Sequence, residues 1–182
     1  VAVIVSENSD ASAVFTSNKI VAAPVIYTKK VVEKGKVSAV FVNSGNANCF
    51  TGNHGIEDCE SLVDLVSKEL NIPKGEIAIS STGVIGRKMP LDVITGVASK
   101  VFSSLGNKPE DSLAAANAIM TTDKIPKQCA LEVTLTGGTC LLTGEKIAPD
   151  YGNLETYETF EDLEAAFKKQ IDYFMDKMLL AC

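Results

Sequence analysis

The feature that most constrains the fold is a strand-like run, a helical stripe and a second strand-like run that follow one another in the first half of the chain. Val37–Asn43 is apolar and indicates a buried strand. Ile56–Leu70 places apolar residues at helical spacing, and Asn71-Ile72-Pro73 ends this helix. Ile77–Ser80 is then a short apolar strand. The sequence therefore predicts two strands separated by an amphipathic helix.

The remaining secondary structure follows from the same signals. Pro24 lacks the N–H that a strand ladder needs, so it is expected at the edge or the end of its strand. Further helices are predicted at Leu91–Leu105, at Ser112–Met120 and after a capping box at Thr159–Asp162. Further strands are predicted at Val1–Ser6, Ala13–Thr16, Ile20–Tyr27, Cys129–Leu135 and Cys140–Leu142, the last two joined by a hairpin turn.

Composition and charge exclude several classes of function. The chain has 182 residues, 46% of them hydrophobic, and no apolar run approaches the length of a transmembrane helix. The apolar start is too short for a signal peptide and lacks a basic flank. The formal net charge of −6 argues against a nucleic acid or an anionic membrane as the main partner.

The cysteines favour a reducing cytoplasm over a disulfide framework, because they are odd in number and form no Cys-x-x-Cys pair. A metal site built from Cys49, His54 and Cys59 is conceivable, but their spacing matches no zinc pattern. We therefore predict no metal site. Buried thiols and a loop histidine are the alternative interpretation. The five cysteines are Cys49, Cys59, Cys129, Cys140 and Cys182.

The stretch Ser81–Gly86 carries the clearest chemical signal, because it lies between a strand-like and a helix-like segment. A glycine-rich corner there can aim the Thr82 hydroxyl and the Gly83 N–H at one point. Such a pair of fixed donors suits the oxyanion that develops during acyl transfer. A plain turn is the alternative. Arg87 and Lys88 follow, and they either bind a substrate carboxylate or form a solvated charged pair.

Two other polar motifs stand at the ends of predicted elements. Asn43–Asn48 presents three carboxamides and a glycine on a loop after a strand, where they either contact a substrate or bond their own loop. Thr121-Thr122-Asp123 ends an alanine-rich helix, and its hydroxyls either cap that helix or bind a substrate.

In this order and spacing the three motifs resemble the N-terminal part of the ornithine acetyltransferase (glutamate N-acetyltransferase) family. The resemblance runs from Val3 to about Leu135 and includes Val14-Phe15-Thr16 and Ala22–Val25. It implies a mixed α/β fold with helices layered outside two packed β-sheets. It also implies a cytoplasmic or mitochondrial enzyme of arginine biosynthesis that moves an acetyl group from N-acetylornithine to glutamate without a cofactor.

The resemblance further implies a precursor that cleaves itself into an α and a β chain, which assemble as α2β2. The β chain begins with a threonine that is acetylated and then deacetylated in a ping-pong scheme. Thr82 and Gly83 match the oxyanion positions of the family, and Thr121 matches a substrate-binding position. Residues that we expect to shape the site are Asn43, Gly45, Asn46 and Thr122.

The tail departs from the family after about residue 140. We expect a family-like domain over residues 1–142 and a divergent segment with an amphipathic helix over residues 143–182. The family's glycine loop and Ala-Thr-Met-Leu cleavage site are missing, and Lys146–Pro149 is the nearest echo. Asn153 then stands where the nucleophile would fall, so no nucleophile is predicted in this chain. Gly152–Met178 faintly resembles glycyl radical enzymes of the pyruvate formate-lyase type, without their radical glycine or catalytic cysteine motif.

Three functions remain open at this point. The first is the α subunit of an acetyltransferase that works with a β chain. The second is a binding or scaffold protein derived from that family, without the catalytic threonine. The third is an amidohydrolase or aminopeptidase of related fold, which uses the same donors with water as the acceptor.

Overall fold

The computed structural model describes residues 1–7, 9–127, 130–135 and 138–143. The chain divides into two compact units, Val1–Pro126 and Lys127–Cys182. The first unit holds the three polar motifs that the sequence singles out. In the second unit, the described strands β4 (Ala130–Leu135) and β5 (Gly138–Thr143) pair antiparallel, with Leu135 opposite Gly138. This pairing confirms the predicted hairpin.

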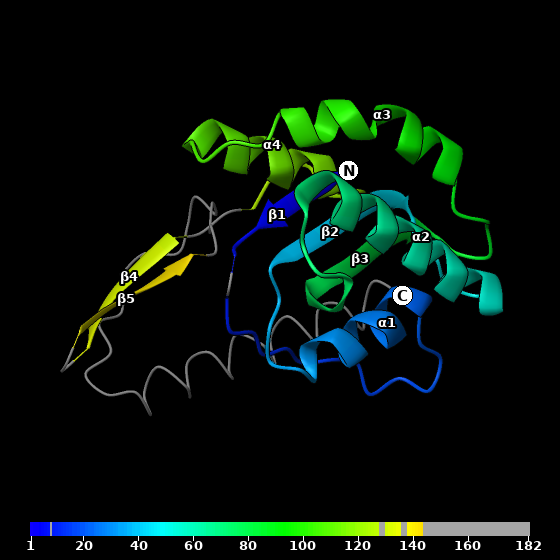
Figure 1. Cartoon of the computed structure of the whole chain (residues 1–182), viewed down its shortest axis with the longest axis horizontal. Coiled ribbons are helices and arrows are strands. Elements are labelled where there is room, and N and C mark those ends of the chain that lie inside the picture. The colour runs from blue at the N-terminus through cyan, green and yellow to red at the C-terminus, as the bar shows by residue number, and fades with distance from the viewer. Residues whose placement is uncertain (8, 128–129, 136–137, 144–182) are drawn as a thin grey trace. The chain divides into compact units, whose positions relative to one another are not determined.

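A three-stranded sheet forms the centre of the first unit (Figure 1). Its strands are β1 (Ala2–Val5), β2 (Ala39–Asn46) and β3 (Ile77–Val84), in that order across the sheet. β1 runs antiparallel to β2, and β3 runs parallel to it. Parallel neighbours need a long crossover, which α2 (Asn53–Leu70) provides. The strand, helix and strand predicted from the sequence are therefore confirmed.

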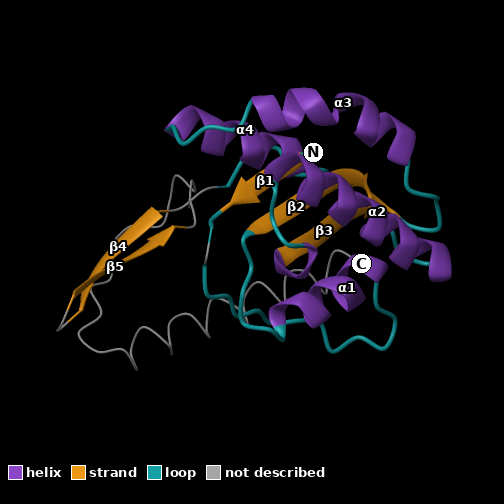
Figure 2. Cartoon of the chain, in the orientation of Figure 1, coloured by secondary structure: helices purple, strands orange, loops and turns teal. Residues whose placement is uncertain are grey.

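Helices cover both faces of this sheet (Figure 2). α1 (Ala23–Val32) and α2 contact β3, and α4 (Pro109–Ile119) contacts β1 and β2. α3 (Leu91–Ser103) packs on α2 and β1, and a short 3-10 helix, η1 (Lys74–Glu76), leads into β3. The helices predicted at Leu91–Leu105 and Ser112–Met120 correspond to α3 and α4. The mixed α/β fold is thus confirmed.

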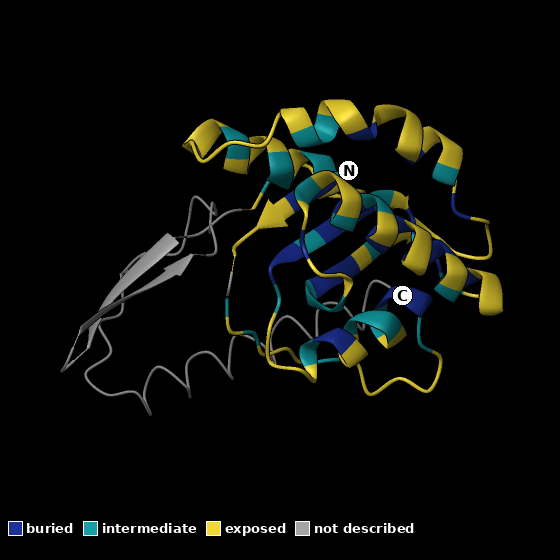
Figure 3. Cartoon of the chain, viewed as in Figure 1, coloured by how far each residue is buried: buried dark blue, intermediate teal, exposed yellow. Residues whose placement is uncertain are grey.

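The core lies between α2 and one face of the sheet, and Figure 3 shows buried positions along β2 and β3. Phe41 of β2 is 1% exposed and belongs to the same cluster as Leu62 and Val63 of α2. Ile77 and Ile79 of β3 complete that cluster. Burying a side chain of this size contributes roughly 1.5–3 kcal/mol. The apolar stripe read from the sequence is therefore what fixes α2 onto the sheet.

The strand predicted at Ile20–Tyr27 is wrong, because this stretch begins α1. Pro24 occupies the first turn of that helix, where its missing N–H has no intrahelical partner to lose and its fixed φ suits the helix. The strand predicted at Ala13–Thr16 is also wrong, since the structure assigns no strand there. The helix predicted after Thr159 lies outside the described residues, as does the expected segment 143–182 apart from Thr143. Within the described ranges, no helix is long and apolar enough to cross a membrane.

Candidate active site

The structure places two of the three polar motifs side by side on parallel strands. Ser44 of β2 lies opposite Thr82 of β3, and Gly45 lies opposite Gly83. The sequence predicts a corner at 81–86 and a loop at 43–48, and both expectations need correction. β3 continues to Val84 and β2 continues to Asn46, because each strand is the hydrogen-bonding partner of the other.

The alternation of backbone groups along β3 decides where the Gly83 N–H points. The Val84 carbonyl accepts a bond of 3.0 Å from the Ala47 N–H, so the backbone groups of Val84 face β2. The Ile79 N–H and carbonyl are both bonded to the Thr28 hydroxyl of α1, so those groups face away from β2. Along a strand, the N–H and C=O of one residue point to the same side, and those of the next residue point to the opposite side. Gly83 shares the parity of Ile79, so its N–H is directed to the outer edge of β3.

The Thr82 side chain lies on the sheet face that α4 covers. Thr82 is exposed, and residues opposite each other on parallel strands share a face, so its side chain is on the same side as that of Ser44. The Ser44 hydroxyl donates a hydrogen bond of 2.8 Å to the Ala118 carbonyl near the end of α4. Thr82 therefore stands on the face to which the end of α4 is tied.

Thr121 and Thr122 follow directly after the end of α4. Both are exposed, and Thr121 is three residues from Ala118, which anchors this helix end to β2. Within the described ranges no hydrogen bond joins Thr121 or Thr122 to Thr82 or Gly83. The third motif is held near the other two because the end of α4 that precedes it is bonded to Ser44 of β2.

Gly83 and Gly45 lie opposite each other on the two strands, and both have a positive φ. Gly83 has φ +132° and Gly45 has φ +103°, which are conformations that side chains rarely adopt. A Cβ on Gly83 would lie 2.3 Å from the Gly45 carbonyl carbon and 2.6 Å from the Asn46 nitrogen. Gly83 is therefore required both by its φ and by the space it leaves for β2, whereas Gly45 is favoured by its φ alone, since a Cβ there meets nothing within 4 Å.

The carboxamides of the asparagine motif bind the protein's own backbone. Asn43 Nδ2 donates to the Asn46 carbonyl at 2.8 Å, and Asn43 Oδ1 accepts from the Ser81 hydroxyl. Asn46 Nδ2 donates to the carbonyls of Arg87 and Lys88 at 3.1 and 3.0 Å. Asn43 thus joins the two motifs, and Asn46 holds the segment that follows β3.

Asn48 performs the same task in the loop between β2 and α2. It is fully buried, and its Nδ2 donates to the Gly55 carbonyl at 2.8 Å. Its Oδ1 accepts from the Thr51 hydroxyl at 2.8 Å, while its backbone carbonyl accepts from the Ala23 N–H. The asparagines therefore hold the strand ends in place, which is the self-bonded alternative that the sequence left open.

The cysteine and histidine near this loop do not converge on a metal. Cys59 is fully buried, and burial raises the pKa of its thiol to about 12. His54 is exposed, and its Nδ1 lies 3.0 Å from Glu57 Oε2. Across the described residues, no group of three His, Cys, Asp or Glu side chains is placed to hold a metal ion.

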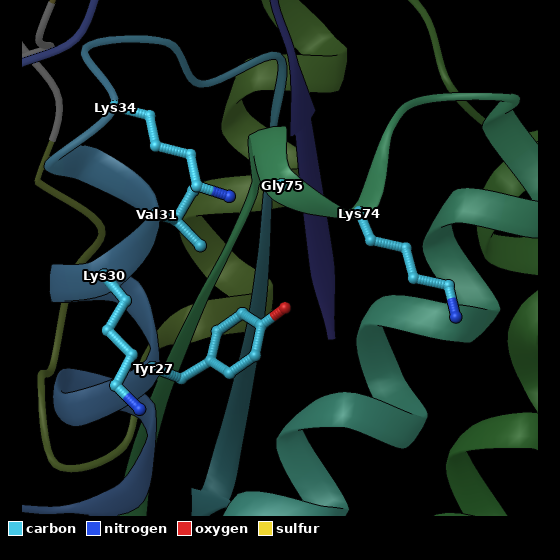
Figure 4. Close-up of a pocket in the computed structure, with 6 residues that line it drawn as sticks. All are labelled: Tyr27, Lys30, Val31, Lys34, Lys74 and Gly75. Carbon is cyan, nitrogen blue, oxygen red and sulfur yellow. The ribbon is translucent and has the colours of Figure 1, made fainter.

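Among the described residues, two of the hollows in the first unit are lined by neither Thr82 nor Gly83. Figure 4 shows the hollow between α1 and η1, lined by Tyr27, Lys30, Val31, Lys34, Lys74 and Gly75. Its Lys74 points towards α2, where Nζ lies 2.6 Å from Asp64 Oδ1. The second hollow is lined partly by Asp58, a buried carboxylate of α2. Asp58 is not among the residues singled out from the sequence. A helical wheel of α2 would place this carboxylate next to Cys59 of the apolar stripe and so predict that it is buried.

Comparisons with known proteins agree with these motifs. The model of the ArgJ family matches residues 1–146, and a model described as pyruvate formate lyase-like matches residues 121–182. The glutamate N-acetyltransferase of Methanothermobacter thermautotrophicus is 45% identical over 138 residues, which are 76% of this chain and 34% of that protein. The one of Methanocaldococcus jannaschii is 42% identical over 146 residues, 79% of this chain and 36% of that protein. The chain thus spans about a third of the length of these curated relatives.

Solved structures give the same result. The arginine biosynthesis bifunctional protein argJ of Bacillus halodurans is matched with a TM-score of 0.71 and 33% identity, over 85% of this chain and 80% of that chain. The ornithine acetyltransferase of Mycobacterium tuberculosis, solved in complex with ornithine, is matched with a TM-score of 0.71 and 31% identity, over 85% of this chain and 81% of that chain. The resemblance seen in the sequence motifs is confirmed, and the chain belongs to the ArgJ family.

Proposed function

We propose that this chain is the α part of a glutamate N-acetyltransferase, which moves an acetyl group from N-acetylornithine to glutamate in arginine biosynthesis. One observation carries the proposal. The chain belongs to the ArgJ family, and its exposed Thr82 side chain is followed directly by a Gly83 N–H that is directed to the edge of β3. The two donors belong to consecutive residues. In this proposal, both donate to the same oxygen atom.

In the proposed reaction, a threonine hydroxyl attacks the acetyl carbonyl carbon of N-acetylornithine. The carbonyl oxygen becomes negatively charged, and the Thr82 hydroxyl and Gly83 N–H donate hydrogen bonds to it. The C–N bond breaks, ornithine leaves with the proton given up by the threonine, and an acetyl ester remains. The amine of glutamate then attacks the ester and regenerates the hydroxyl, so the scheme is ping-pong.

The attacking threonine comes, in this proposal, from a second chain that begins with it. Two coverage figures support such a division. The chain matches 80% of the solved Bacillus halodurans chain but only 34% of the curated Methanothermobacter protein. A precursor that is cut in two accounts for solved chains that are much shorter than the curated sequences. An α2β2 assembly and a cytoplasmic location belong to the same proposal.

Thr121 is assigned to substrate binding, because the exposed residue follows the end of α4 that is anchored on Ser44. Asn43, Gly45 and Asn46 position the ends of β2 and β3 through their bonds and close approach. Thr122 shapes the site beside Thr121. No cofactor takes part in the proposed chemistry.

The test uses two substitutions of Thr82 in the enzyme assembled with the rest of the protein. Thr82→Val keeps the branched shape and removes the hydroxyl, and Thr82→Ser keeps the hydroxyl. Loss of one oxyanion donor lowers kcat about 10²–10³-fold, so we expect that loss in Thr82→Val and only a few-fold change in Thr82→Ser. The assay measures the rate at which ornithine is released from N-acetylornithine in the presence of glutamate. Equal rates for the two variants would remove Thr82 from the mechanism.

A second candidate is a family-derived binding protein without activity. The pyruvate formate lyase-like match over residues 121–182 favours it, because the tail departs from the ArgJ pattern. Acetyl transfer by the assembled protein rejects this candidate. Binding of ornithine without transfer supports it. Release of acetate instead of acetylglutamate indicates the third function, an amidohydrolase that uses water as the acceptor.

A further inference from the structure

Ser44 of β2 connects the central sheet to the end of α4. Its hydroxyl donates a hydrogen bond of 2.8 Å to the Ala118 carbonyl, across 74 residues of sequence. The last four carbonyls of a helix have no partner inside it, and α4 ends at Ile119. The Ala118 carbonyl must therefore find its partner outside the helix, and Ser44 provides that partner.

Apolar burial does little to hold α4 in place. None of its 11 residues, all of which the structure describes, is buried, whereas α2 buries six of its residues. A helix of this length is marginal by itself in water. Elements with few buried apolar contacts also open locally at a low cost in free energy. One hydrogen bond at the end of α4 consequently has a large share in fixing where that end lies.

The Ser44–Ala118 bond lies beside the polar motifs of the proposed site. Ser44 is opposite Thr82 in the register of β2 and β3, and neighbouring strands are about 4.8 Å apart. Thr121 follows Ala118 by three residues, which span at most about 11 Å. The bond therefore limits how far Thr121 can move from the face of the sheet that carries Thr82.

We propose that Ser44 is a positioning residue, whose bond to Ala118 holds Thr121 where it binds the substrate. The inference rests on the proposed function, because the substrate-binding role of Thr121 belongs to that proposal. The Ser44 hydroxyl gives its proton to the Ala118 carbonyl, so Ser44 acts through Thr121 and not on the substrate. Loss of this hydroxyl weakens substrate binding and leaves the oxyanion donors in place.

The experiment compares Ser44→Ala with Ser44→Thr in the enzyme assembled with the rest of the protein. Alanine removes the hydroxyl, and threonine keeps it on a residue type that strands favour. An unpaired carbonyl changes an equilibrium constant by about tenfold, so amide hydrogen exchange at the end of α4 should accelerate about tenfold in Ser44→Ala. The dissociation constant of ornithine, measured by calorimetry, should rise by a similar factor. Because only binding is affected, kcat at saturating substrate should stay within about twofold of the wild type. Ser44→Thr should resemble the wild type in all three measurements.

A double-mutant cycle with Thr121→Ala tests whether Ser44 acts through Thr121. If it does, Ser44→Ala should no longer weaken ornithine binding once Thr121 has been replaced, so the two effects should not add. Ser61→Ala is the matched control, because Ser61 also donates to a helix carbonyl, at 2.9 Å, but within α2. It should leave both the exchange in α4 and the binding of ornithine unchanged.

The outcomes separate this inference from the proposed function. The inference is overturned if the end of α4 exchanges equally fast in Ser44→Ala and the wild type, if ornithine binding is unchanged, or if the effects of Ser44→Ala and Thr121→Ala add in full. Acetyl transfer can proceed in each of these cases. If the wild type transfers no acetyl group but the cycle shows coupling, the proposed function fails and the positioning of Thr121 by Ser44 stands. A wild type that does not bind ornithine overturns both.

Discussion

Gly83 of β3 lies so close to Gly45 of β2 that a Cβ on Gly83 would come within 2.3 Å of the Gly45 carbonyl carbon. Real Cβ atoms do not approach backbone so closely, and a backbone neighbour cannot swing aside as a side chain can. The approach occurs at the residue whose N–H we assign to the oxyanion. Strand pairing and the proposed chemistry therefore depend on the same missing side chain.

Gly83→Ala should destabilise the protein by more than about 2 kcal/mol, because it adds steric overlap to a φ that only glycine adopts readily. Gly96→Ala is the matched control. A Cβ there meets nothing within 4 Å on α3, and the helix gains roughly 0.5–1 kcal/mol from the change. Urea unfolding measures both variants. A Gly83→Ala protein as stable as the wild type contradicts the strand geometry.

Thr28→Val should destabilise the outer edge of β3, where the Thr28 hydroxyl bonds the backbone of Ile79. The Thr28 hydroxyl donates to the Ile79 carbonyl at 2.7 Å and accepts from its N–H at 2.9 Å, so valine leaves two backbone groups unpaired. Leaving such groups unsatisfied costs about 1–3 kcal/mol, whereas Thr28→Ser should cost much less. Amide hydrogen exchange at Ile79 should accelerate in the valine variant alone. Equal protection in the two variants would show that the hydroxyl does not seal this edge.

Asn46→Asp should loosen the segment that follows β3. Asparagine Nδ2 donates to the carbonyls of Arg87 and Lys88, whereas an aspartate oxygen would face those two carbonyls without a proton. We expect a loss of roughly 2–3 kcal/mol by thermal unfolding. Asn117→Asp is the control, because Asn117 is exposed and makes one bond within α4, to the Leu113 carbonyl. Its cost should stay under about 1 kcal/mol.

Cys59 should make stability depend on alkaline pH. Burial raises the pKa of its thiol from 9.0 to about 12, so between these values the unfolded chain ionises Cys59 while the folded chain keeps it protonated. The folded state then binds more protons, and the free energy of unfolding falls as pH rises above 9, by up to about 1.4 kcal/mol per pH unit.

The comparison for this pH dependence is Cys59→Ala, which lacks the thiol and should show a shallower fall above pH 9 than the wild type. Denaturant unfolding across this range gives both curves. Parallel curves for Cys59→Ala and the wild type would contradict the raised pKa.

The sequence predicts the core of the first unit well, because one helix and two strands carry unambiguous patterns. The stripe through Leu62, Val63 and Val66 can be buried only if that segment is a helix, and all three residues are at most 1% exposed. The same holds for the apolar runs that begin β2 and β3. Local patterns suffice here, because the spacing of the apolar residues along the chain indicates both the type of element and its buried face.

Pro24 shows where local patterns fail. The apolar, branched residues around it are typical of a strand, and proline is compatible with both a strand edge and the first turn of a helix. Packing of α1 against β3, with Thr28 bonded to Ile79, decides for the helix. A long-range contact of this kind leaves no trace in the spacing of residues along the chain.

The polar motifs divide in the same way. By itself the sequence determined which chemistry the chain offers, since Thr82-Gly83, the asparagine cluster and Thr121 are visible without any structure. Only the tertiary structure decided that the carboxamides bind backbone, that β2 and β3 run on through both glycines, and that Asp58 of α2 is buried. The physical reason is that hydrogen-bond partners and burial come from other segments, and these meet only when the sheet is assembled.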